Sequence, residues 1–324
     1  MAKLENADRS WGTEWKGRND GLVAHVFFHK NLNFALSVFA FAVEGWIFYS
    51  AVNSITPQIV LNLGFDSDSW TISLRQLAFS LTNLVFSFPV TWYSTQFKDL
   101  RTPLIVTWIF FLVTYDVLFH CCLAPPQHPS LTLSHRCILY ATIRPTWNTA
   151  QIGFNVIAGI GQSGPLTLLV ACVQFTSPHA YLSTATGLAF SARAIGGAFG
   201  SAVLDAIVNG RIAANYAPAV SAAATAAGLP LSSVPDLLAA IAQGNFGDPA
   251  VVGATDAVWA AATDESQWQY AYAYRLAWSS VIPFVVLALI AVWFMRDVSE
   301  LMTEKVEATV EHVHPREEKE TVAA

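Results

Sequence analysis

Long apolar stretches dominate the pattern of hydrophobic and polar positions in this chain. A helix needs about 20 mostly apolar residues to cross the roughly 30 Å hydrocarbon layer of a bilayer, and several stretches reach that length. Most charged residues lie between or beyond them. The pattern predicts six membrane-spanning helices, at Phe34–Leu61, Thr71–Trp92, Pro103–Leu123, Ile152–Gln174, Ser183–Val208 and Ala277–Met295.

The polar segments between these spans divide the chain into three parts and two long connections. The parts are a polar segment at 1–33, a six-span unit at 34–295 and a charged tail at 296–324; the long connections are 124–151 and 209–276. The second connection is rich in alanine. Within it, a proline and an aspartate in a first turn predict a short helix that begins near Ser233 and ends at Gly244.

Composition agrees with a membrane protein and argues against other classes. Charged residues make up 12% of the chain, against about 25% in ordinary soluble domains, and the mean hydropathy is +0.43. The net charge of −6 gives no reason to expect nucleic acid. Residues 1–33 lack the apolar core of a signal peptide. Phosphate-binding and metalloprotease motifs are absent and the cysteines lack metal spacing, so we expect no enzyme, cofactor or metal.

Lysine and arginine are distributed unequally between the two sides of the predicted membrane protein. If both termini face the cytoplasm, that side carries the cations of residues 1–33, of the tail and of the connection between the second and third spans. The opposite side carries Arg136, Arg144 and Arg211. Cytoplasmic connections are enriched in Lys and Arg, so we expect both termini in the cytoplasm.

Charged residues inside the spans are the first candidates for function, because a charge at the bilayer centre costs about 2.5–3.5 kcal/mol on insertion scales. Glu44 lies near the middle of the first span and is a candidate proton site; a structural hydrogen bond is the alternative. Arg193 lies too deep in the fifth span to reach the headgroups, whereas Arg75 is close enough to a span end to do so. Pairing of Arg193 with a carboxylate is a hypothesis, with Asp205 on its own span and Asp116 on the third.

Pro57 predicts an interruption near the end of the first span, because proline removes a backbone donor. A helix broken at membrane depth is tolerated where it lines a cavity. A kink that serves packing alone is the alternative. The predicted pathway residues are Tyr49, Asn53 and Gln58 of this span, Asn155 and Gln162 of the fourth, and Glu44, Arg193 and Asp205.

Glycines mark the fourth and fifth spans. Gly196 and Gly200 form a small-xxx-small face that lets helices approach closely, and Gly197 lies beside them. In the fourth span, Gly161 precedes a Gly-Pro pair that predicts a helix able to flex. The predicted packing and flexing residues are Gly161, Gly164, Pro165, Gly196, Gly197 and Gly200.

Several of these runs resemble the C-terminal half of fungal major facilitator transporters, in the trichothecene-efflux-pump-like branch that includes siderophore transporters. The runs are Phe41–Tyr49, Asn155–Pro165, Ala185–Gly200 and Met302–Val306. The resemblance implies an all-α polytopic membrane protein whose six helices form one half, the C-terminal domain, of a major facilitator fold. Residues 1–33 then resemble the central cytoplasmic loop.

The family implies a proton-coupled carrier of the plasma membrane that works by alternating access. Efflux of toxins, drugs or related small organic molecules is the expected function, and iron-siderophore uptake is the alternative. The implied partners are the lipid bilayer, a small-molecule substrate, protons and an N-terminal transporter half, in the same full-length chain or separate. The chain departs from the family in holding six spans and in residues 124–140. A truncated, non-transporting or regulatory fragment is therefore the alternative from another class.

Overall fold

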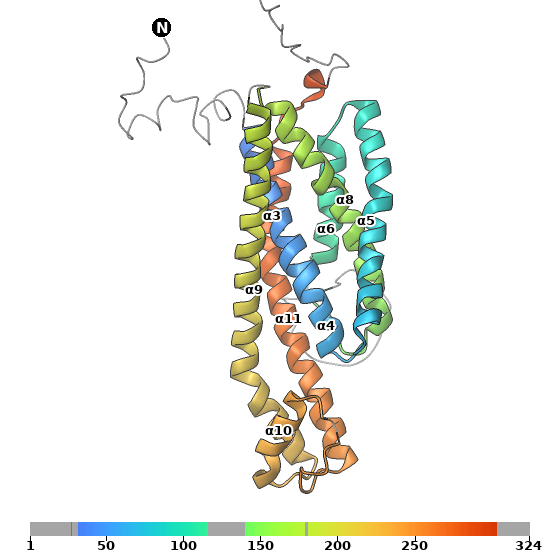
Figure 1. The fold of residues 1–324 in the computed structure, drawn as a ribbon, viewed down its shortest axis with the longest axis vertical. Coiled ribbons are helices and arrows are strands. Elements are labelled where there is room, and N and C mark those ends of the chain that lie inside the picture. Colours follow the sequence, from blue (N-terminus) through green and yellow to red (C-terminus); the bar gives the residue numbers. More distant parts are fainter. Residues whose placement is uncertain (1–26, 28–31, 116–139, 179–180, 246, 303–324) are drawn as a thin grey trace, which may run out of the picture.

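The computed structural model describes residues 27, 32–115, 140–178, 181–245 and 247–302, and within them the chain is helical and contains no strand (Figure 1). In chain order the helices are α3 (Asn33–Trp46), the π-helix η1 (Ile47–Ile55), α4 (Thr56–Asn62), α5 (Ser69–Phe97), α6 (Arg101–Tyr115), α8 (Asn148–Thr176), α9 (Leu182–Ala226), the 3-10 turn η3 (Leu231–Ser233), α10 (Val234–Ala242), α11 (Asp256–Trp293) and the 3-10 turn η4 (Ser299–Leu301).

Four helical segments of the described chain are long and apolar enough to cross a bilayer. They correspond to the predicted first, fourth, fifth and sixth spans and comprise Asn33–Asn62, Asn148–Thr176, Leu182–Ala226 and Asp256–Trp293. The two other predicted spans fall in α5, which is long but rich in hydroxyl and amide side chains, and in α6, whose described part ends at Tyr115. The chain is an α-helical polytopic protein, and the count of six spans stays a prediction.

Helix packing links the first three predicted spans to the last three. α3 packs along α9, α8 and α11, and α8 packs along α5 and α6 (Figure 1). The first helix of each group of three thus packs on the second helix of the other. This reciprocal packing of the two groups is the arrangement expected of an inverted repeat of three helices.

Asn33, the first residue of α3, contacts Arg296, which follows the end of α11. The side-chain Nδ2 of Asn33 donates to the backbone carbonyl of Arg296 at 2.9 Å, and its side-chain Oδ1 accepts from the backbone N–H of Arg296 at 2.8 Å. The start of α3 and the end of α11 therefore lie at the same end of the molecule (Figure 1).

The interruption predicted at Pro57 takes the form of a π-helix in a continuous span. In a π-helix, a backbone N–H bonds the carbonyl five residues earlier. Pro57 has no N–H, and the carbonyl of Val52 instead accepts Nε2 of Gln76 from α5 at 3.3 Å. The hydroxyl of Thr56 donates to the carbonyl of Ala51 at 3.1 Å. Gln76 thus replaces the backbone bond that proline cannot make, whereas the carbonyl of Ala51 accepts both the N–H and the hydroxyl of Thr56.

Two helices extend beyond the rest of the bundle at the end opposite Asn33 (Figure 1). α9 has 45 residues and α11 has 38. At about 1.5 Å per residue, each is longer than the hydrocarbon layer is thick. The hydropathy pattern predicts an end of the fifth span at Val208 and a connection at 209–276, whereas most of that connection is helical. Its alanines explain this, because alanine has the highest helix propensity.

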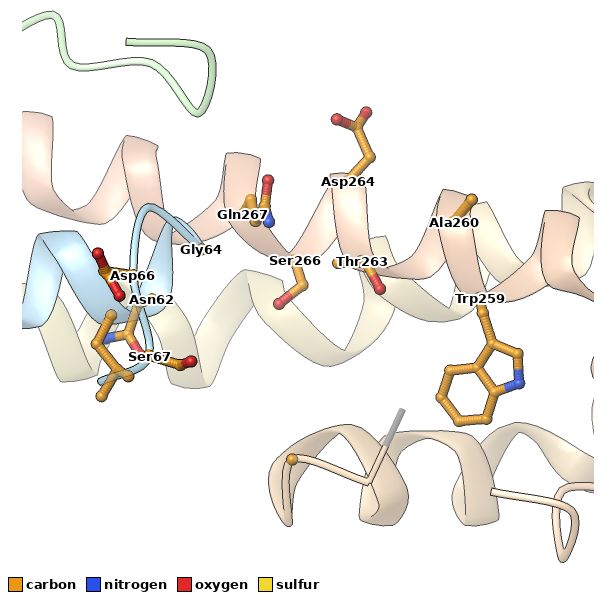
Figure 2. A pocket seen from close by; sticks show the side chains of 12 residues that line it. Asn62, Gly64, Asp66, Ser67, Trp259, Ala260, Thr263, Asp264, Ser266 and Gln267 are labelled. Carbon is orange, nitrogen blue, oxygen red and sulfur yellow. The ribbon is translucent and has the colours of Figure 1, made fainter. Parts of the chain in front are cut away.

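We call residues 212–274 the tip. Within it, α10 packs on α9 and a second, smaller hydrophobic core forms around Val220, Leu237 and Val258. α10 begins after Ser233, as the sequence predicted, and its end is followed by Gly244 with φ +74°. A cavity of about 1040 Å³ lies where the tip meets the bundle (Figure 2).

Candidate functional site

A fully buried carboxylate joins three helices in the bundle. Glu44 of α3 has no exposed surface. Arg193 of α9 donates from Nε to Oε2 of Glu44 at 2.5 Å and from Nη2 to Oε1 at 2.9 Å. Gln162 of α8 donates from Nε2 to Oε1 of the same carboxylate. Pairing of Arg193 with a carboxylate was a hypothesis from the sequence, and in the structure that carboxylate is Glu44 of another helix.

The other faces of the Arg193 guanidinium are covered by aromatic side chains. Its central carbon lies 5.3 Å from the ring centre of Phe41, 4.9 Å from that of Phe48 and 5.0 Å from that of Tyr49. Its Nη1 donates to the hydroxyl of Tyr49 at 3.3 Å. Two-pronged pairing with a carboxylate and stacking on rings are both characteristic of arginine rather than lysine. The site thus holds a charged pair in an otherwise apolar setting.

Glycines allow the helices that carry this pair to approach closely. A Cβ atom at Gly45 would collide with the backbone of Arg193, and one at Gly196 would collide with the backbone of α3. At Gly200 a Cβ atom would overlap the indole of Trp46. The predicted small-residue face of the fifth span therefore lies directly against the first span, around the ion pair.

The other predicted packing residues also lie at close helix contacts, Gly197 against the first span and the glycines of α8 against α6. A Cβ atom at Gly197 would lie 2.6 Å from the ring of Tyr49, and one at Gly161 would lie 2.8 Å from Phe111 of α6. A Cβ atom at Gly164 would overlap Oγ1 of Thr107 on α6, and Pro165 follows Gly164 inside α8. Close contacts to α6 on one side and to Glu44 on the other leave α8 little room to shift without affecting the site.

Three predicted pathway residues lie farther along the first span. Tyr49 is 43% exposed, although its hydroxyl contacts Arg193. Asn53 is exposed and accepts from Gln76 at 3.5 Å. Gln58 is half-buried and donates to the hydroxyl of Ser54 at 3.4 Å. This line of polar groups leads from the buried pair toward the α4 end of the span.

Asp205 is not part of the buried cluster; it is exposed on α9. Asp116 lies outside the described residues. Asn155 is buried but serves another link: its Nδ2 donates to the carbonyl of Arg75 at 2.9 Å, and its Oδ1 accepts from the hydroxyl of Tyr140 at 2.6 Å. Burial raises the pKa of Tyr140, which keeps its hydroxyl a donor.

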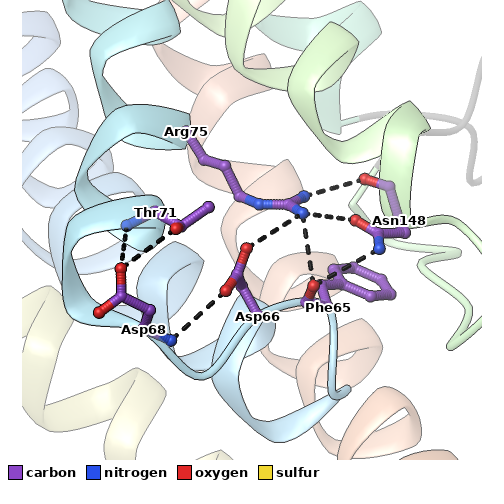
Figure 3. A network of polar contacts seen from close by, with 6 residues as sticks. All are labelled: Phe65, Asp66, Asp68, Thr71, Arg75 and Asn148. Atoms are coloured by element: carbon purple, nitrogen blue, oxygen red, sulfur yellow. Dashed lines mark hydrogen bonds and ion pairs between the residues drawn. The ribbon is translucent and has the colours of Figure 1, made fainter.

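Sequence reasoning missed the role of Arg75, which it placed among the headgroups. Figure 3 shows Arg75 joining the turn after α4 to the start of α8. Its Nη2 donates to Oδ1 of Asn148 at 2.6 Å and to the carbonyl of Phe65 at 3.4 Å, and lies 3.7 Å from Oδ2 of Asp66. Asp68 caps α5 by accepting from the N–H of Thr71 at 3.2 Å. The sequence signal for this role was the turn between α4 and α5, which holds Asp66 and Asp68 and no cation.

A fungal transporter aligns with about half of this chain. Over 171 residues the chain is 29% identical to the MFS-type transporter prx5 of Penicillium rubens, an alignment that covers 52% of this chain and 30% of that protein. The chain thus spans less than a third of the relative that it matches. No family model matches the chain, and no solved structure matches it. The long apolar helices support an integral membrane protein, and over the aligned half this chain is similar to a major facilitator transporter.

Proposed function

We propose that this chain is one half of a secondary active transporter that exports toxins, drugs or related small organic molecules in exchange for protons, by alternating access. The observation that carries the proposal is the Glu44–Arg193 pair, which is buried where α3, α8 and α9 meet. Ionisable residues at membrane depth mark proton and substrate pathways in transporters. The alignment with a transporter points in the same direction.

Protonation of Glu44 is the proposed coupling step. While ionised, Glu44 holds α9 through Arg193 and α8 through Gln162. A proton on Glu44 removes the negative charge, whereas the guanidinium stays charged at every physiological pH. Loss of one partner of a buried pair costs about 3–5 kcal/mol, and transporter conformations differ by only a few kcal/mol. One proton can therefore shift the balance between two arrangements of these helices.

Arg193 has a second set of partners for the protonated state. The hydroxyl of Tyr49 and the rings of Phe41 and Phe48 already lie beside the guanidinium. Cation–π contacts contribute about 0.5–2 kcal/mol each. We assign Glu44 as the proton site, Arg193 as its charge partner and Gln162 as a positioning residue. Tyr49, Asn53 and Gln58 then line the path between this site and the α4 end of the span.

An N-terminal half, in the same full-length chain or separate, would complete the pathway. The alignment with under a third of the relative supports a chain that works as part of a larger carrier. We also propose the plasma membrane as its location, with both termini in the cytoplasm. The uneven distribution of lysine and arginine supports this orientation.

Transport assays in yeast cells that lack their own drug exporters test this proposal. The chain is expressed alone and with the N-terminal half of a full-length relative, and cellular accumulation of a panel of labelled toxic compounds is measured. We expect that cells with the transporter accumulate less of the compound and that this decrease depends on the proton gradient. The decrease should be absent in Glu44→Ala and Arg193→Ala at equal membrane levels. Asp205→Asn is the matched control and should transport normally.

Two results would overturn the proposal. Uptake of a labelled ferric siderophore without export of any toxic compound would replace efflux by iron acquisition. Unchanged accumulation of every compound in every combination, with the chain present in the membrane, would identify a non-transporting fragment.

A further inference from the structure

The side-chain amide of Gln162 has one hydrogen-bond partner among the described residues, and that partner is Glu44. Gln162 is fully buried on α8, and its Nε2 donates to Oε1 of Glu44. No donor of the described chain contacts its Oε1. Asn155, earlier on α8, is held at both ends, because its Nδ2 donates to the carbonyl of Arg75 and its Oδ1 accepts from Tyr140. The direction in which the Gln162 amide points is therefore set by the carboxylate.

Gln162 and Arg193 bond the same carboxylate but differ in chemistry. A guanidinium has five N–H donors and no acceptor, whereas a side-chain amide has both donors and an acceptor oxygen. Both residues donate to Glu44 in the structure. A protonated Glu44 has an O–H to donate, which the oxygen of Gln162 can accept and a guanidinium cannot. Rotation of the amide about its last torsion exchanges nitrogen and oxygen, so Gln162 can bond Glu44 in either form.

The charged surroundings of Glu44 are limited to Arg193 within the described helices. α8 contains no Asp, Glu, Lys, Arg or His, and neither does α11 from Leu276 to its end. On α9 the charged neighbour is Arg193, and the titratable neighbour of that arginine on the first span is Tyr49. A proton on Glu44 therefore changes one contact between opposite charges, to Arg193, and one contact to a neutral group, Gln162.

We propose that Gln162 keeps α8 bonded to α3 in both protonation states of Glu44, so that a proton releases α9 alone. α3 and α8 then move as one unit. Arg193 shifts along the first span toward the hydroxyl of Tyr49, which already lies 3.3 Å from its Nη1. This inference rests on the proposed function, since it states how protonation of Glu44 acts on each neighbouring helix.

Infrared difference spectra of the full chain in lipid nanodiscs, recorded as the pH is lowered, test the bond to Gln162. A protonated Glu44 gives a carboxylic-acid carbonyl band, which is identified by its loss in Glu44→Gln. We expect Gln162→Met to move this band to higher wavenumber, because the acid loses its acceptor while the volume of the side chain is nearly kept. Gln174→Met is the matched control and should leave the band in place, since Gln174 is an exposed glutamine of the same helix.

Distances between pairs of spin labels test the movement of the helices. The labels are attached to cysteines introduced at exposed positions, Phe39 of α3, Phe175 of α8 and Gly187 of α9, in a chain whose four native cysteines are replaced by alanine. Glu44→Gln stands for the protonated state. We expect it to change the α3–α9 distance by about 1–2 Å, as helix shifts do, and to leave the α3–α8 distance unchanged.

The outcomes separate this inference from the proposed function. A Glu44 band that Gln162→Met leaves in place would overturn the inference alone, because Glu44 would still take up a proton. An α3–α8 distance that changes as much as the α3–α9 distance, or no change in either, would do the same. The absence of any acid band that Glu44→Gln removes would overturn the proposed function as well, because Glu44 would then take up no proton.

Discussion

Among the residues that the structure describes, Arg193 pairs with a carboxylate deep in the bundle and Arg75 pairs with one at its end. Arg193 contacts Glu44 through two short hydrogen bonds, and the Glu44 side chain has no exposed surface. Arg75 lies 3.7 Å from Asp66, with 12% and 23% of the two side chains exposed. Arg75 also donates to two backbone carbonyls. The first pair depends on its charges, whereas the second is one contact among several.

The difference teaches which of the two can act as a switch. In a dry interior an unpaired charge is costly, so a change in the charge of Glu44 must move its neighbours. Near water the same change is screened and the remaining contacts hold Arg75 in place. We therefore expect substitution at the fully buried pair to cost much more than substitution at the half-buried pair.

The largest effect is expected from breaking the buried pair. Glu44→Ala or Arg193→Ala should destabilise the protein by about 3–5 kcal/mol, because each leaves a buried charge without its partner. The double variant Glu44→Met with Arg193→Met should recover much of that loss. Thermal stability in nanodiscs measures both. A double variant no more stable than the singles would contradict the account.

A smaller effect is expected from widening the contact between α3 and α9. Gly196→Leu should cost about 1–3 kcal/mol through overpacking and should separate Arg193 from Glu44. Gly187→Leu and Gly210→Leu on the same helix are controls, since a Cβ atom at either position meets nothing within 4 Å. Folded yield and thermal stability decide the comparison. Similar losses at all three positions would show that α9 does not pack on α3 as described.

The π-helix allows a sharper test of an unpaired carbonyl. Gln76→Ala should cost about 1–3 kcal/mol, because it leaves the carbonyl of Val52 without a donor. In a Pro57→Ala background the restored N–H can bond that carbonyl, and Gln76→Ala should then be nearly neutral. A double-mutant cycle of thermal stabilities measures this coupling. Additive effects would argue against the replacement of the backbone bond by Gln76.

The smallest effect is expected at the half-buried pair of Arg75 and Asp66. Asp66→Asn should cost no more than about 1 kcal/mol, as weak ion pairs do, because the two charges are 3.7 Å apart and Asn148 and the carbonyl of Phe65 still hold Arg75. Its thermal stability should lie within a few degrees of wild type. A loss as large as that of Glu44→Ala would remove the distinction between the two pairs.

The sequence revealed which residues were exceptional but not which of them meet. Depth in a span identified Glu44 and Arg193, yet they are 149 residues apart, and helix packing alone brings them together. Glycine spacing predicted that another helix packs closely on the fifth span, but it did not predict which helix. Asn155 was predicted to line a pathway, which stays a prediction, and in the structure it bonds Tyr140 and the carbonyl of Arg75. Polarity alone cannot distinguish these roles.

The tip shows a different limit of sequence reasoning. The fifth span was ended at Val208 because hydropathy falls there, but hydropathy reports transfer into lipid and not helix formation. Alanine continues the helix to Ala226. The π-helix could not be predicted from the sequence either. Pro57 predicts an interruption of the helix, but the form of that interruption depends on the side chain of Gln76 from α5.

Proton movement driven by substrate tests the central claim most directly. Vesicles with the complete transporter, wild type or Glu44→Gln, are loaded with a transported compound, and the internal pH is followed as the compound moves down its gradient. Glutamine keeps the shape of glutamate but cannot take up a proton. The account predicts that wild type moves protons inward as substrate leaves, so that the internal pH falls. It also predicts that Glu44→Gln still moves substrate across the membrane without a change in internal pH. Proton movement by Glu44→Gln equal to that of wild type would show that Glu44 is not the coupling site.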